Sequence, residues 1–279
     1  MQVYLNGAYI DAGAATISVD DRGFLFADGV YEVMRVYPGG IFLGDAHVER
    51  MRAGLAALHI HTAPADSLLE ISERLLDANQ LRGRDATIYA QVTRGAAPRK
   101  HAFPPADTPT TVYVAARPFK QHPDSYFSEG CTTITVPDTR WSRCDIKTIA
   151  LLPNVLANQA AHAAGAFEAL YVRDGVVIEG SHSNLFAVLD GTLITYPSCN
   201  YILTGITRNF VIELARELRI PVRETGLLWE QLYRADELFL SGTTTEVMPI
   251  AAVDERQVGG GRPGPVTRRL MEAFRERIQ

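Results

Sequence analysis

Lys147 is the residue whose type and setting most clearly suggest chemistry. It is one of only three lysines in a chain with 27 Lys and Arg residues together, and it lies in a largely apolar run, residues 144–152. Arginine keeps its charge, whereas a lysine withdrawn from water can lose its proton and attack a carbonyl carbon. Lys147 is therefore a candidate for forming a Schiff base. The alternative is a strand in which Lys147 points to water while neighbouring Ile residues point inward.

Two hydroxyl-bearing segments could bind an anion. Gly205-Ile206-Thr207-Arg208 places a glycine and a hydroxyl at the expected start of a helix, where free backbone N–H groups can hold a phosphate. Ser241-Gly242-Thr243-Thr244-Thr245 is a turn that follows an apolar strand. The alternatives are a simple Thr cap for the first segment and an ordinary surface turn for the second.

Two further clusters carry charge. Glu179 ends the apolar stretch Val177-Ile178 and is followed by the polar turn Gly180-Ser181-His182-Ser183-Asn184. A semi-buried glutamate there needs a cationic or proton-donating partner, either a pyridinium nitrogen or an arginine. In the basic loop 94–103, Arg99 and His101 stand two residues apart and could converge on one carboxylate. A solvated run of charges is the alternative for that loop.

Composition narrows the classes of protein to consider. The 279 residues are 47% hydrophobic and 21% charged, which is typical of a globular protein with room for two domains. The net charge of -5 and pI near 5.8 give no reason to expect nucleic acid or an anionic membrane as partner. The three cysteines are odd in number and widely spaced, so they signal neither a disulfide framework nor a metal site. No targeting or membrane-spanning segment is evident, and we expect a soluble cytoplasmic protein.

The pattern of elements favours an α+β fold, because strands and helices are mixed without regular alternation. We expect a helix capped by Asp45, a second after Asp66, a third capped by Asn154 and an amphipathic helix over 209–218. Expected strands include 30–37, 87–93, 111–116 and 131–137. We divide the chain into a small N-terminal α+β domain (1–117), a linker (118–124) and a larger C-terminal α+β domain (125–279) that carries Lys147.

Taken together, these clusters match what pyridoxal phosphate requires: a lysine, a phosphate site, a carboxylate for the ring nitrogen and a clamp for the substrate carboxylate. The chain resembles the fold-type IV pyridoxal-phosphate enzymes, which are two-domain α+β proteins with the cofactor at the domain interface, and among them the D-amino-acid aminotransferases. Motifs in the same order cover nearly the whole chain. The matching stretches are 20–33, 47–50, 91–95, 99–101, 144–147, 179–184 and 202–208.

The resemblance implies a role for each motif residue. Lys147 would hold pyridoxal 5'-phosphate as a Schiff base and Glu179 would pair with its ring nitrogen, while Leu203 would pack on the ring. The phosphate would be bound by Arg50, Ile206, Thr207, Thr243 and Thr244. The substrate α-carboxylate would be held by Tyr31, Arg99 and His101, the last two from the neighbouring subunit of a homodimer.

The implied activity is ping-pong transamination from a D-amino acid to a 2-oxo acid such as 2-oxoglutarate or pyruvate. Branched-chain L-amino-acid aminotransferases share the lysine, glutamate and phosphate residues but lack the Arg99-x-His101 loop, and they are the first alternative. (R)-amine transaminases and aminodeoxychorismate lyase share the same fold and are the next alternatives. A protein that only sequesters the cofactor is a further alternative. His182 departs from the small serine usual at its position in the D-specific relatives.

Overall fold

The computed structural model describes residues 1–61 and 65–278, which form two compact units. The first unit contains residues 1–120 and 146–150, and the second contains 121–145 and 151–278. The division after Lys120 falls within the expected linker 118–124. Lys147, however, belongs to the first unit and not to the C-terminal one as we expected. The reason is that its segment pairs with a strand of the first unit, through a bridge between Val30 and Thr148.

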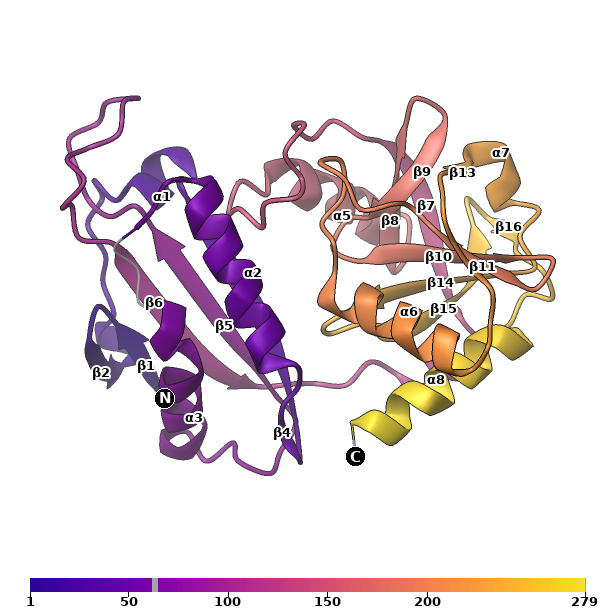
Figure 1. Cartoon of the computed structure of the whole chain (residues 1–279), viewed down its shortest axis with the longest axis horizontal. Coiled ribbons are helices and arrows are strands. Elements are labelled where there is room, and N and C mark those ends of the chain that lie inside the picture. Colours follow the sequence, from indigo (N-terminus) through magenta and orange to yellow (C-terminus); the bar gives the residue numbers. More distant parts are fainter. Residues whose placement is uncertain (62–64, 279) are drawn as a thin grey trace. The chain divides into compact units, whose positions relative to one another are not determined.

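The first unit is built on a six-stranded antiparallel sheet with the order β2-β1-β6-β5-β3-β4 (Figure 1). Its two longest pairings are β5 with β6 and β3 with β5, each over eight residues, the latter from Gly29 opposite Thr93 to Val36 opposite Ala86. The strands are β1 (Gln2–Leu5), β2 (Ala8–Asp11), β3 (Gly29–Tyr37), β4 (Gly40–Ile41), β5 (Ala86–Thr93) and β6 (Thr111–Pro118).

The core of this unit lies between the sheet and the helices α2 (Gly44–Ala57) and α3 (Leu68–Ala78). Alternation along β3 sends Val30, Met34 and Val36 into this core, as the period of a strand requires. The short helices are η1 (Ala12–Ala14), α1 (Arg22–Phe26) and η2 (Ala65–Ser67).

Asp45 does not cap α2, contrary to our expectation. The helix begins at Gly44, and its N-cap is Leu43 in a left-handed conformation (φ 51°). Asp45 therefore lies in the first turn, where its charge still interacts favourably with the positive end of the helix dipole.

The second unit is built on a ten-stranded mixed sheet with the order β12-β11-β10-β14-β15-β7-β8-β9-β13, and β16 pairs with β15. The pairs β11–β12, β15–β7 and β7–β8 are parallel. The strands are β7 (Cys131–Pro137), β8 (Glu168–Arg173), β9 (Val176–Gly180), β10 (Asn184–Leu189), β11 (Thr192–Thr195), β12 (Val222–Glu224), β13 (Leu227–Leu228), β14 (Glu237–Gly242), β15 (Glu246–Val253) and β16 (Arg256–Gln257).

Helices pack on this sheet. Helices α6 and α8 lie side by side against β14 and β15, and α5 packs on β8 (Figure 1). The helices are α4 (Asp124–Ser128), α5 (Leu152–Ala163), α6 (Ile206–Glu217), α7 (Trp229–Leu232) and α8 (Pro265–Arg277). Helix α6 starts at Ile206, earlier than the expected Asn209, which places Thr207 inside its first turn.

No helix among residues 1–61 and 65–278 is both long enough and apolar enough to cross a membrane. The three cysteines are free thiols, and Cys131 and Cys144 are buried. Burial raises the pKa of the Cys144 thiol to about 11. Cys144 therefore stays protonated near neutral pH, as a packing residue does.

Glu237 is expected to stabilise the second unit through α8. Its buried carboxylate accepts hydrogen bonds from the first-turn N–H groups of Val266 (3.0 Å) and Thr267 (2.7 Å), and a charge there also complements the helix dipole. We predict that Glu237→Gln lowers the free energy of unfolding by about 1–2 kcal/mol, measured from the urea midpoint at pH 7. Glu276→Gln, at an exposed position of α8, is the control and should change it by less than about 0.5 kcal/mol. Equal midpoints for the two variants would refute this role of Glu237.

Candidate active site

The backbone around Lys147 is fixed to strand β3. The Lys147 carbonyl oxygen accepts a hydrogen bond from the Tyr31 N–H (3.0 Å), and the Ile149 N–H donates to the Gly29 carbonyl (3.2 Å). A Cβ on Gly29 would lie 2.5 Å from the Val92 carbonyl oxygen, so the position has no room for a side chain. Lys147 itself lies outside regular secondary structure, which does not match the alternative of a strand lysine.

The Lys147 side chain is half-buried against an aromatic ring. Its Nζ lies 4.2 Å from the centroid of the Tyr31 ring, which is a favourable position for an ammonium group. The Tyr31 ring in turn stacks on Tyr89, with centroids 5.9 Å apart. Burial, together with the neighbouring Glu32 carboxylate, raises the pKa of Tyr31 to about 12. The Tyr31 hydroxyl therefore remains protonated, and can donate a hydrogen bond, across the neutral range.

Glu32 orients Arg50. The buried carboxylate receives Arg50 Nε on Oε1 (2.7 Å) and Arg50 Nη2 on Oε2 (2.8 Å), and His47 Nδ1 lies 2.7 Å from Oε2. Burial alone would raise the pKa of Glu32, but the charge and hydrogen bonds of Arg50, aided by His47, lower it to about 2. The ion pair with Glu32 thus holds the Arg50 guanidinium by two of its three nitrogens, Nε and Nη2, and Nη1 takes no part in it.

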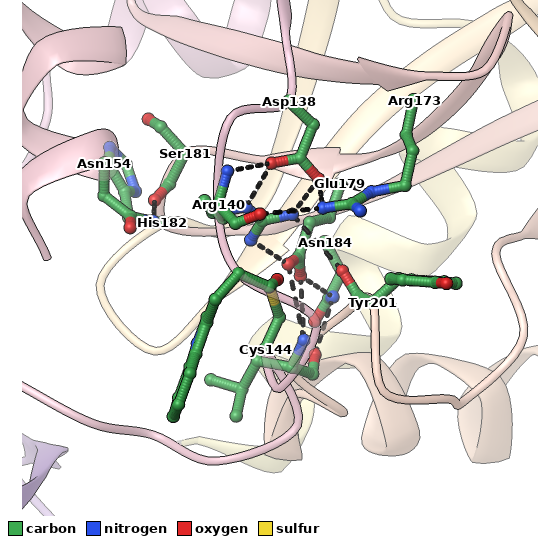
Figure 2. Close-up of polar contacts among 12 residues, drawn as sticks. Asp138, Arg140, Cys144, Asn154, Arg173, Glu179, Ser181, His182, Asn184 and Tyr201 are labelled. Atoms are coloured by element: carbon green, nitrogen blue, oxygen red, sulfur yellow. Dashed lines mark hydrogen bonds and ion pairs between the residues drawn. The ribbon is translucent and has the colours of Figure 1, made fainter. Parts of the chain in front are cut away.

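Glu179 lies in the second unit, where it is buried among hydrogen-bond donors (Figure 2). Arg140 Nη1 donates to Oε1 (2.5 Å), Asn184 Nδ2 donates to Oε2 (3.0 Å), and the Leu203 N–H also points to Oε2 (3.2 Å). An arginine is therefore one partner of this carboxylate, as one of our two interpretations required.

Arg140 is itself held by a second carboxylate. Asp138 accepts from Arg140 Nε (2.9 Å) and Nη2 (3.1 Å), and it also accepts from Arg173 (Figure 2). Burial would raise the pKa of Asp138, but hydrogen bonds from Arg140 and Arg173 and the charge of Arg140 lower it. Arg173, Asp138, Arg140 and Glu179 thus form a chain of alternating charge.

The charge of Glu179 is only partly compensated by these partners. Burial raises its pKa to about 7, although Arg140 and the Leu203 N–H both act to lower it. A carboxyl group with this pKa is only partly ionised at neutral pH. Its ionised form would therefore be favoured by one more cationic or proton-donating partner.

Asn184 connects Glu179 to the two segments expected to bind an anion. Besides Glu179, its Nδ2 donates to the Leu203 carbonyl (2.9 Å). A Cβ on Gly205 would lie 2.2 Å from Asn184 Oδ1, so the chain passes close to this amide. On its other side, Asn184 is paired with Ser241 across β10 and β14.

The start of α6 offers backbone donors. Gly205 is the N-cap, and no side chain caps the helix. The first hydrogen bond from this end runs from the Asn209 N–H to the Gly205 carbonyl (3.0 Å), which leaves the N–H groups of Ile206, Thr207 and Arg208 without helical partners. Thr207 is buried beside them, so backbone donors, a hydroxyl and the positive end of the dipole coincide.

The last residues of β14 and the turn that follows them add hydroxyl groups. Ser241 Oγ is buried, and the described residues offer it no hydrogen-bond partner. Thr245 is buried, while Thr243 and Thr244 are half-buried. An unmet buried hydroxyl is costly, and an anion accepting from this turn would remove that cost.

The turn that follows Glu179 is held by another carboxylate. Buried Glu168 accepts from the His182 N–H (2.7 Å) and Ser183 Oγ (2.9 Å). Asn154 does not cap α5 as we expected, because the helix begins at Leu152 and Asn154 lies in its first turn, where its Nδ2 donates to the Ser181 carbonyl (2.7 Å). The His182 ring is half-exposed, and its Nδ1 lies 3.4 Å from Glu168. His182 thus interacts with the turn and is not among the contacts of Glu179.

Arg99 and His101 are exposed, and within one chain the described contacts do not bring them to Tyr31 or Lys147. Both side chains contact the ring of Phe26 instead. Of the sequence-predicted residues, the structure therefore groups Lys147, Tyr31 and Arg50 around β3 and α2, and separately groups Glu179, Leu203 and Gly205 around Asn184.

No role was predicted from the sequence for Glu32 or Arg140. Glu32 shares the buried face of β3 with Val30 and Met34, so a carboxylate in an apolar stripe was the available signal of a buried partner. Arg140 gives a weaker signal, since the sequence shows only that it stands three residues after the end of a strand. Among the described residues, no group of three or more His, Cys, Asp or Glu side chains is placed to hold a metal ion.

Curated relatives match the whole chain. D-alanine aminotransferase from Bacillus licheniformis is 39% identical over 280 residues, covering 100% of this chain and 97% of the relative. D-alanine aminotransferase from Staphylococcus haemolyticus is 38% identical over 279 residues, covering 100% and 98%.

Solved structures agree in fold. Branched-chain amino acid aminotransferase from Escherichia coli superposes with a TM-score of 0.91 at 30% identity, covering 99% of this chain and 93% of that chain. A second branched-chain enzyme (T.th.), solved with pyridoxamine 5'-phosphate, gives 0.90 at 31% identity, with the same coverage. The model of the family amino-transferase class IV matches residues 29–253. The family expected from the motifs is confirmed, and the chain belongs to the class IV aminotransferases.

Proposed function

We propose that the protein is a pyridoxal-phosphate-dependent D-amino-acid transaminase, which moves the amino group of a D-alanine-like amino acid to 2-oxoglutarate or pyruvate. The observation that carries the cofactor is Glu179, a buried carboxylate whose pKa stays near 7 beside Arg140. A protonated ring nitrogen is the additional partner that such a carboxylate favours. The matches to D-alanine aminotransferases over the full chain support the substrate class.

We assign the cofactor to the residues of the matching motifs. Lys147 would bind it covalently, Glu179 would hold a proton on its ring nitrogen, and Leu203 would pack on its ring. The phosphate ligands would be Arg50, Ile206, Thr207, Thr243 and Thr244. The uncapped start of α6 and the unmet Ser241 hydroxyl support a bound anion in the second unit.

The chemistry of the chain's own residues follows from these positions. When bound, pyridoxal phosphate would supply an electron-withdrawing ring that stabilises negative charge at the substrate Cα. The amine of Lys147, released when the substrate amine takes its place, would remove the Cα proton as a general base. Because the same residues serve the donor amino acid and then the acceptor 2-oxo acid, the kinetics should be ping-pong.

The hand of the substrate is proposed to depend on Tyr31, Arg99 and His101, which would hold its α-carboxylate. Since Arg99 and His101 are exposed and contact neither Tyr31 nor Lys147 within the described chain, we propose that they serve the second subunit of a homodimer. The free thiols and acidic composition are compatible with the cytoplasmic location that we propose.

A branched-chain aminotransferase is the second candidate, because the solved structures reported above carry that name. Their identity to this chain is lower than that of the D-alanine aminotransferases, at 30–31% against 38–39%. The Arg99-x-His101 loop also favours the D-amino acid.

We predict that the cofactor-loaded wild-type protein turns over D-alanine at least about tenfold faster than L-leucine, with 2-oxoglutarate as acceptor. The measurement is a coupled assay of pyruvate formation, matched by an assay of the keto acid of leucine. Rapid turnover of L-leucine without turnover of D-alanine would replace this proposal by the branched-chain candidate. Absence of any transfer, despite a bound cofactor, would favour a protein that only sequesters it.

Lys147→Ala should abolish both the visible absorbance of the lysine-bound cofactor and transamination, because the amine for the covalent bond and for proton transfer is lost. Lys120→Ala is the matched control, since Lys120 is exposed and lies outside the proposed site. Absorbance spectra of both purified proteins, recorded with equal added pyridoxal phosphate, give the answer. A Lys147→Ala protein that keeps the spectrum and the activity would show that the central assignment is wrong.

Glu179→Gln should lower the rate of the half-reaction with D-alanine by about 10²-fold, because a neutral amide cannot hold a proton on the ring nitrogen as a carboxylate does. Cofactor binding should persist through Lys147. Single-turnover absorbance changes measure this rate, and an unchanged rate would remove Glu179 from the chemistry.

The same variant tests the charge state of Glu179 in the cofactor-free protein. The folded pKa of about 7 exceeds the ordinary value of 4.5, so between these pH values the folded state keeps a proton that the unfolded state has lost. Stability from this group therefore falls as pH rises through that window. The free energy of unfolding of wild type relative to Glu179→Gln should drop by on the order of 2 kcal/mol from pH 4.5 to pH 7.5. A pH-independent difference would contradict the raised pKa.

A further inference from the structure

Helix α1 contacts both side chains of the proposed carboxylate clamp. The centroid of the Phe26 ring lies 5.2 Å from Arg99 Cζ and 5.5 Å from the centroid of the His101 ring. A single half-buried ring at the end of α1 therefore supports two exposed side chains that lie two residues apart. A guanidinium and an imidazole are both attracted to an aromatic ring in such positions.

Arg22, at the other end of α1, holds the backbone of the same loop. Its guanidinium is buried, and Nη1 donates to the carbonyls of Lys100 (2.6 Å) and Ala102 (3.4 Å). Nη2 points to the carbonyl of His101 (3.5 Å). Three successive carbonyl groups around the clamp residues thus face one arginine, whose rigid fork suits such a set of acceptors.

Asp28 binds Arg22 and also Arg94, which contacts the end of the same loop. It accepts from Arg22 Nε (2.8 Å) and from Arg94 Nε (2.8 Å) and Nη2 (2.9 Å). Arg94 lies over the ring of Phe103 at 3.7 Å. Burial would raise the pKa of Asp28, but hydrogen bonds and charge from Arg94 and Arg22 lower it, so Asp28 stays ionised at neutral pH.

The beginning of the loop is also fixed to α1. The Arg22 N–H donates to the Gly95 carbonyl (2.9 Å). Gly95 has a φ of +90°, and a Cβ there would lie 1.9 Å from the Pro109 carbonyl oxygen. The loop therefore leaves β5 in one defined direction, towards the helix that carries Phe26.

We propose that α1 presets the substrate-carboxylate clamp: Phe26 orients the side chains of Arg99 and His101, and Arg22, itself held by Asp28, fixes their backbone. Phe26 and Arg22 are positioning residues, since they act on the substrate only through the clamp. Presetting matters because exposed, flexible side chains must otherwise be ordered each time a carboxylate binds. The inference rests on the proposed function, which makes Arg99 and His101 ligands of the substrate.

Phe26→Leu tests the ring against a matched control in the same helix. Leucine keeps an apolar side chain but removes the ring, whereas Phe24→Leu changes a residue of α1 that is 70% exposed. In single-turnover half-reactions, Phe26→Leu should raise the apparent Kd for D-alanine by about tenfold and leave the limiting rate within about twofold. Phe24→Leu should match the wild type. Phe26→Tyr, which keeps the ring, should restore tight binding.

A second readout does not depend on turnover. Amide hydrogen exchange of residues 96–103 and tryptic cleavage after Arg99 and Lys100 should both accelerate in Phe26→Leu and in Arg22→Lys, and remain unchanged in Phe24→Leu. Arg22→Lys should also weaken D-alanine binding, so it replaces Phe26→Leu if that variant does not fold.

The outcomes separate the two proposals. Failure of wild type to use D-alanine would defeat the proposed function, while the exchange and cleavage rates would still report on α1. Unchanged Kd, exchange and cleavage in Phe26→Leu would overturn the proposal for α1. A Phe26→Leu protein that lost only the limiting rate of the half-reaction would also overturn the proposal for α1. A clamp that only binds the carboxylate affects binding, which precedes the chemical step.

Discussion

The burial of one carboxylate, that of Glu179, is the constraint around which the second unit is organised. Glu179 cannot be stabilised by water, so Arg140 and the amide of Asn184 surround it. Arg140 would itself be costly to bury alone, and Asp138 and then Arg173 continue the alternation towards the surface. A charged group at the centre therefore determines which residue types can stand at the ends of β7, β8 and β9.

Regular elements were largely predictable, because their signals are local. Alternation gave β3, β5 and β7 nearly to the residue. Both predicted caps were wrong, because each helix begins before the residue that was expected to cap it. Asn154 lies in the first turn of α5 and donates to the Ser181 carbonyl. Leu43, with its left-handed backbone, is the N-cap of α2 in place of Asp45.

The sequence predicted those residues of the candidate site whose type alone suggests a chemical role. Lys147, Glu179 and the clamp loop could be named, since a lysine, a carboxylate and a basic pair stand out against their surroundings. Their partners could not, because Arg140 meets Glu179 across 39 residues and Arg22 meets Lys100 across 78. The sequence does not indicate which of its many arginines will be buried. Which unit holds Lys147 was missed for a similar reason, as a single bridge decides it.

The return of residues 146–150 to β3 means that the chain enters the first unit twice. A gene fragment that ended at residue 120 would encode a sheet without the strip that lies along Gly29 and Tyr31. Recombination between two related genes at a single point between β3 and residue 146 would likewise combine β3 of one parent with residues 146–150, including Lys147, of the other. Each unit is compact, but the first unit cannot be encoded by one continuous stretch of the gene. Substitutions in residues 146–150 and in the facing part of β3 must therefore remain compatible with each other.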